Sequence, residues 1–227
     1  MLRDMDVPVE PASRIVRVIV ALLGSNAVDA LGMVLRLARR MFSLKVHEGM
    51  YEVLEYDVQL EILDPKGEKA VLHKREKVRF LSDNIIAYQD QAWGDGDIFA
   101  EYACSPGVPV DQYREGHRYR ILISLRETKN RNDIEEFRID RAIKHGFTKV
   151  VEDFQIEIDH MTRHFSISVI FPKKRFAKQV LLIERNATKT TELATENLMI
   201  LPDGRQQVTW TTDHPRVYEN YILRWQW

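Results

Sequence analysis

The sequence predicts a mainly β protein, an antiparallel β-sandwich preceded by an α-helical segment. From about residue 51 onward, apolar and polar residues alternate in short stretches, which is the pattern of half-buried strands. Turn sequences rich in Pro, Gly and Asp separate these stretches. No regular helical pattern lies between them, so the chain favours antiparallel sandwiches over a parallel βαβ sheet.

The first expected element is helical and covers residues 13–42. Ser13 is a suitable N-cap, and Gly24 with the Ser and Asn that follow it marks a break. Either two short helices or one kinked helix fits this pattern. Apolar residues recur at helical spacing and arginines gather in the last turn. The residues that we expect to form its contact surface are Ile15, Val18, Ile19, Leu22, Leu31, Val34, Leu35, Arg36, Arg39 and Arg40.

Three roles are open for this helical segment. It can pack on the β-rich body or on a second copy of the chain, bind or insert into a membrane, or dock on another protein. Residues 18–35 hold no basic residue, as a membrane segment requires, but Asp29 would cost about 2.5–3.5 kcal/mol at a bilayer centre. The sequence favours the packed helix.

The strands are expected in a body that covers residues 46–227, after the helical region 1–45. Asp64-Pro65-Lys66-Gly67 and Pro202-Asp203-Gly204-Arg205 predict two hairpin turns. Residues 135–143 alternate as a strand, with a helix closed by Gly146 as the alternative. The expected strands are 51–63, 69–80, 85–91, 97–104, 117–125, 135–143, 154–158, 165–169, 179–184, 206–211 and 220–227.

Two arrangements of these strands remain open: one large sandwich, or two small sandwiches in tandem. A loop rich in Pro and Gly at 105–116 and a polar run at 128–133 place an internal boundary, if there is one, near 105–133. The final strand places aromatic residues on one face, which indicates burial of that face.

Charge is nearly balanced over the whole chain, with a formal net charge of −1 at pH 7. No global field therefore attracts nucleic acid. Residues 1–45 carry +3, which favours a contact surface for a protein or a membrane. Two basic clusters, 73–79 and 173–185, are interpreted as solvated faces, and the first as the exposed face of a strand.

Cys104 is the only cysteine, which excludes an intramolecular disulfide and favours a reducing, cytoplasmic location. The sequence contains no nucleophile elbow, P-loop or dinucleotide fingerprint. These observations favour a protein without catalytic activity and without a cofactor.

The acidic stretch around Trp93-Gly94-Asp95-Gly96-Asp97 is the best local candidate for a divalent cation site. Carboxylate oxygens on a tight glycine-rich loop suit Ca²⁺, although an ordinary turn between strands explains the same residues. The candidate metal ligands are Asp90, Asp95, Asp97 and Glu101.

The function that we expect is that of a non-enzymatic interaction or regulatory protein. The β-sandwich would provide recognition surfaces, and the N-terminal helices would mediate self-association or docking on a protein partner. A membrane-acting protein that binds through residues 13–42 is the first alternative, and a metal-dependent hydrolase is the second.

Overall fold

Strands dominate residues 49–227, the part of the chain that the computed structural model describes. The mainly β class predicted from the sequence is therefore confirmed. These residues form one unit with one continuous hydrophobic core. The predicted helical segment 13–42 and its ten contact residues lie outside the described residues.

The largest sheet has seven strands in the order β12-β13-β9-β1-β2-β7-β4. Its neighbours are antiparallel except for β1 and β9, which run parallel. In sheet order the strands are β12 (Leu198–Ile200), β13 (Gln206–Asp213), β9 (Thr162–Phe171), β1 (Tyr51–Ile62), β2 (Lys69–Phe80), β7 (Ile134–Lys144) and β4 (Asp97–Ser105).

Two smaller sheets accompany the large one. Four strands have the order β11-β10-β14-β8, and three have the order β3-β6-β5. A 3₁₀ turn, η2 (Thr195–Asn197), precedes β12. The strands of the smaller sheets are β11 (Lys189–Glu192), β10 (Gln179–Glu184), β14 (Asn220–Gln226), β8 (Val151–Glu157), β3 (Ile85–Ala92), β6 (Arg118–Lys129) and β5 (Val108–Glu115).

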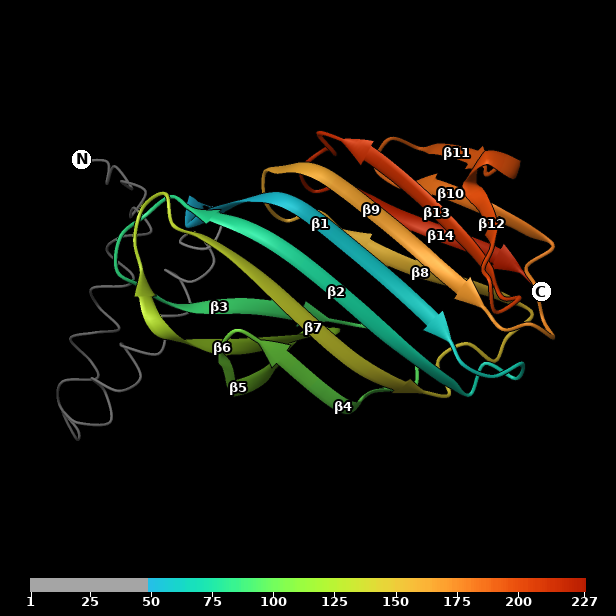
Figure 1. Cartoon of the computed structure of the whole chain (residues 1–227), viewed down its shortest axis with the longest axis horizontal. Coiled ribbons are helices and arrows are strands. Elements are labelled where there is room, and N and C mark those ends of the chain that lie inside the picture. The colour runs from blue at the N-terminus through green and yellow to red at the C-terminus, as the bar shows by residue number, and fades with distance from the viewer. Residues whose placement is uncertain (1–48) are drawn as a thin grey trace, which may run out of the picture. The chain divides into compact units, whose positions relative to one another are not determined.

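Both smaller sheets pack against one face of the large sheet, so the unit is a two-layered sandwich (Figure 1). Under β9, Phe165 meets Tyr221 of β14 at a ring-centroid distance of 5.3 Å. Under β7, Phe137 stacks on Tyr88 of β3 at 3.9 Å. The seven-stranded sheet therefore spans both smaller sheets. The sequence left open one large sandwich or two small ones in tandem. The structure combines features of both, because the seven-stranded layer is continuous and the opposite layer is divided into two sheets.

Alternation within each strand explains which face is buried. Along β2, every second residue from Ala70 to Phe80 points into the core. The predicted turn at 64–67 connects β1 and β2. The Asp64 carboxylate accepts the backbone N–H groups of Lys66 and Lys69 at 2.8 and 2.7 Å. Gly67 has a φ of +74°, and an added Cβ there would collide with the Phe147 carbonyl oxygen.

The structure corrects three details of the predicted strands. Residues 108–115 form the edge strand β5, although Pro and Gly predicted a loop. β11 and β12, also at sheet edges, are two further strands that the alternation did not reveal. Finally, β1 and β9 are parallel rather than antiparallel. The segment 135–143 is a strand, as predicted, and not the alternative helix.

Candidate ligand-binding site

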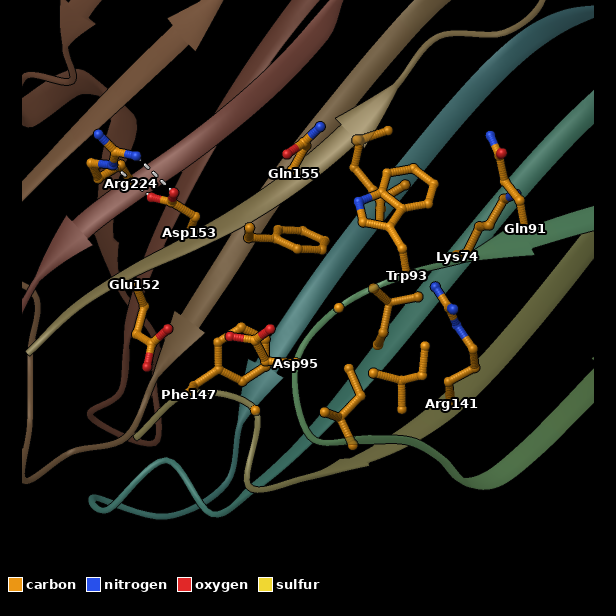
Figure 2. Close-up of a pocket in the computed structure, with 18 of the residues that line it drawn as sticks. Lys74, Gln91, Trp93, Asp95, Arg141, Phe147, Glu152, Asp153, Gln155 and Arg224 are labelled. Carbon is orange, nitrogen blue, oxygen red and sulfur yellow. Dashed lines mark hydrogen bonds and ion pairs between the residues drawn. The ribbon is translucent and has the colours of Figure 1, made fainter. Parts of the chain in front are cut away.

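A cleft opens into the sandwich between β3 and β8, the edge strands at which the two smaller sheets face each other (Figure 2). Its volume is about 430 Å³, within the range of small-molecule sites. Inward-facing residues of β1, β2 and β7 form its floor. The loop after β3 forms one wall, and β8 with the loop before it forms the other.

The floor of the cleft carries two cationic side chains, Lys74 from β2 and Arg141 from β7. Each lies on the inner face of its strand, where Leu72 and Ile143 provide the apolar floor beside them. Both cations are largely excluded from water, since each residue is less than one-tenth exposed. Buried cations require anionic partners or a ligand, because isolated charges in a low-dielectric interior are strongly destabilising.

Lys74 has two such partners within the chain. Its Nζ lies 3.0 Å from Asp90 Oδ1 and 3.0 Å from Glu76 Oε2, and both carboxylates are buried. The Tyr102 hydroxyl donates to Asp90 Oδ2 at 3.1 Å, and the Tyr88 hydroxyl donates to Glu76. Lys74 is therefore the centre of a satisfied buried network that joins β2, β3 and β4.

The two carboxylates of this network differ in their titration. Burial raises the pKa of Glu76 above its usual value, and this effect outweighs the attraction of Lys74. Burial acts in the same direction on Asp90, but Lys74 and Arg141 attract its charge and hold its pKa below the usual value. Asp90 is thus the ionised partner of Lys74, and Glu76 is the carboxyl that tends to keep its proton. Burial opposes the charge on Lys74, yet Asp90 and Glu76 keep the pKa of Lys74 well above its usual value.

Arg141 differs from Lys74 in having no direct partner. Its Nε is buried, and the guanidinium forms no hydrogen bond or ion pair with any other residue of the 49–227 unit. Its charge attracts that of Asp90 at longer range and helps to lower the pKa of Asp90. Figure 2 shows the guanidinium directed toward the middle of the cleft, below Trp93 in that view.

The two ends of the cleft are held by polar contacts. At one end Arg118 of β6 pairs with Glu157 of β8, and its guanidinium lies 4.8 Å from the centroid of the Trp93 ring. At the mouth Lys149 Nζ lies 2.5 Å from Asp95 Oδ2. These contacts fix Trp93 as a wall of the cleft and connect its two sides.

The structure does not gather the predicted metal ligands. Asp90 is bonded to Lys74 inside the sandwich, whereas Asp95 lies at the mouth of the cleft beside Lys149. Asp97 and Glu101 belong to β4, where Asp97 accepts the Phe99 N–H at 3.2 Å. Within the described residues, no group of three or more His, Cys, Asp or Glu side chains is placed to hold a metal ion.

The basic cluster at 73–79 divides between the two faces of β2. Arg75 and its outward-facing neighbours pair with acids on adjacent strands, as in the 2.8 Å contact of Arg75 Nη2 with Glu55 Oε2. The interpretation as an exposed face is correct for these residues and wrong for Lys74, which is buried. In the second cluster, Arg175 stacks over the Trp227 ring at 4.0 Å.

Sequence reasoning missed both cations on the floor of the cleft, although a signal was present. Lys74 has the same alternation parity as Leu72 and Val78, and Arg141 has the same parity as Ile139 and Ile143. A charged residue at an inward position of a strand indicates a buried site. The position of these strands side by side in the sheet could not be read from that pattern.

No protein-family model and no curated protein matches this chain. Within residues 49–227, no helix is both long enough and apolar enough to pass through a bilayer.

Proposed function

We propose that this protein is a non-enzymatic recognition protein that binds a small molecule in the cleft between β3 and β8. The observation that carries the proposal is the division of one layer of the sandwich. Two sheet edges face each other over a continuous floor, and they leave a cleft of about 430 Å³ that reaches the buried cations. A cleft of this size that combines apolar surface with converging polar groups is typical of ligand sites.

Two features support recognition rather than catalysis. Lys74 is held between two carboxylates that keep its pKa high, so its amine stays protonated and is a poor nucleophile. Burial raises the pKa of the Cys104 thiol, which opposes formation of the reactive thiolate. On the cleft floor, Lys74 thus acts as a fixed charge.

A blocking variant tests the role of the cleft. Val151 lines the wall, whereas its neighbour Val150 does not, and both side chains are about half exposed or more. We expect Val151→Trp to abolish ligand-induced thermal stabilisation across a panel of small metabolites, and Val150→Trp to leave it unchanged. Native mass spectrometry of the full-length protein would identify a retained ligand directly.

Two results would overturn the proposal. One is equal stabilisation of Val151→Trp and wild type by every ligand that binds, because the cleft would then not be the site. The other is turnover of a panel compound that Val151→Trp loses, because the cleft would then be catalytic.

The N-terminal region adds a second part to the proposal, which depends on the sequence alone. Residues 13–42 would mediate self-association or docking and so connect ligand binding to a partner. Light scattering of the full chain and of residues 46–227 tests this role. A full-length oligomer that becomes a monomer on truncation supports this role. The same number of chains per particle in both proteins contradicts self-association through residues 13–42.

A further inference from the structure

Arg141 is a buried cation of the cleft whose hydrogen bonding is not satisfied by the described residues. It is 7% exposed, its Nε has no acceptor, and the guanidinium makes no direct pair in the described part of the chain. Buried polar groups are nearly always hydrogen-bonded, and an unpartnered buried guanidinium is costly. The neighbouring Lys74 shows that this interior supplies direct carboxylate partners where a cation is structural.

On the basis of the proposed function, we infer that the cleft binds a small organic anion, a carboxylate or a phosphate monoester, whose charged head pairs with Arg141. A guanidinium presents parallel N–H donors that match both kinds of anion in a two-bond geometry. The head group would complete the hydrogen bonding that the chain leaves open at Arg141 Nε.

The acids around the cleft already have partners other than Arg141. Lys74 lies on the same floor, and Asp90 is already engaged by Lys74 and by the Tyr102 hydroxyl. At the mouth, Asp95 is paired with Lys149 and Asp153 with Arg224, so these two acids are neutralised before a ligand reaches the floor. Glu152 is the remaining acid of the wall, and one of its oxygens accepts the Lys149 backbone N–H at 2.5 Å.

Beside its polar residues, the cleft also offers apolar surface to the rest of the ligand. Trp93 and Phe147 belong to opposite walls, and Ile98 and Ile143 also line the cleft. Such walls exclude water from the head group, which strengthens its pairing with Arg141. A flat ring or short hydrocarbon attached to the anion fits these surfaces better than a free inorganic ion does.

Calorimetric titration of the full-length protein with four probes tests this assignment. Benzoate and phenyl phosphate carry the two head groups, benzamide is the neutral counterpart, and inorganic phosphate lacks the apolar body. We expect at least one of the two organic anions to bind more tightly than benzamide and than inorganic phosphate. The comparison of benzoate with phenyl phosphate identifies the head group.

Three variants locate the contact. Arg141→Met should weaken binding of the preferred anion about 10- to 100-fold, the effect of losing a charge-assisted hydrogen bond. Arg141→Lys keeps the charge but not the planar fork, and it should fall between wild type and Arg141→Met. Arg138→Met changes the same residue type on the outer face of the same strand and should bind as wild type does.

The outcomes separate this inference from the proposed function. In one outcome, benzamide and the anions bind equally, and binding is lost in Val151→Trp but kept in Arg141→Met. The proposed function then stands, because the cleft binds a ligand, but the inference that this ligand is an anion is rejected. Failure of both organic anions to bind wild type more tightly than benzamide rejects the inference as well. Melting temperatures of the variants near that of wild type ensure that lost binding does not reflect unfolding.

Discussion

The two halves of the sandwich interior share one continuous sheet but are filled with different chemistry. Where β9 and β13 face β14, the contacts are aromatic, as in the packing of Phe171 against Trp225 at 5.5 Å. Where β2 and β7 face β3, the interior between the two layers also holds the charged residues Lys74, Asp90 and Arg141. The first half is filled by packed aromatic rings, and the second holds a buried charge network beside the cleft. The two halves therefore differ in which interactions stabilise them, and the proposed ligand site belongs to the charged half.

Removal of an aromatic side chain from the first half should have the largest effect. Trp225 is almost fully buried against Phe171 and Trp227. We expect Trp225→Ala to lower the free energy of unfolding by about 3–5 kcal/mol, measured by urea denaturation. Trp225→Phe is the control. It keeps most of the volume and removes a buried indole N–H without an acceptor in residues 49–227, so its loss should be clearly smaller.

Removal of the central cation from the second half should be nearly as damaging. Lys74→Met leaves Asp90 and Glu76 buried without their cation, and we expect a loss of about 3–5 kcal/mol. Lys77→Met, on the outer face of the same strand, should cost about 1 kcal/mol or less, since its pair with Glu55 is partly exposed. Equal losses in the two variants would show that the buried network does not stabilise the fold.

The buried network of the second half should also give the protein a pH dependence. The folded protein holds the Glu76 proton above pH 4.5, where the unfolded chain releases it. Stability of wild type should therefore fall, relative to Glu76→Gln, as the pH rises from 4.5 through the raised pKa of this carboxyl.

Glu136→Gln is the matched control for the sign of this effect. Hydrogen bonds from Arg138 and Arg75 lower the pKa of Glu136, so its contribution is lost as the pH falls below 4.5. Urea unfolding of wild type and both variants over a pH series measures the two slopes. For each variant, the slope is that of the difference in unfolding free energy between wild type and variant, plotted against pH. Two slopes of the same sign would contradict the opposite pKa shifts of Glu76 and Glu136.

Arg141 should have the smallest effect on stability, although it is buried. Since it has no direct partner, we expect Arg141→Met to change the free energy of unfolding by about 1 kcal/mol or less, or to stabilise the protein. Thermal and urea denaturation without ligand measure this. A loss comparable to that of Lys74→Met would mean that Arg141 is a structural cation and not a group that awaits a ligand.

The sequence predicted the strands whose alternation is regular and the turns whose chemistry is local. The turn at 64–67 is an example, because Asp64 and Gly67 form its contacts within a few residues. The sequence did not predict β5, because Pro109 indicated a loop. A proline is compatible with a strand only at the edge of a sheet, and β5 is such an edge strand. The cleft could not be predicted, because it arises from the gap between β3 and β8, which no local pattern records.

The parallel pairing of β1 with β9 has a consequence for how the chain is made. β1 is the first strand of the described unit, yet it lies in the middle of the large sheet beside a strand more than 100 residues later, with Val53 opposite Thr162. During synthesis one edge of β1 therefore waits unpaired until most of the unit has left the ribosome. Contacts so distant in sequence slow folding. Until they form, the unpaired edge of β1 can pair with strands of other chains and so promote aggregation. Nascent chains that end before β9 should consequently depend on chaperones far more than chains that extend beyond it.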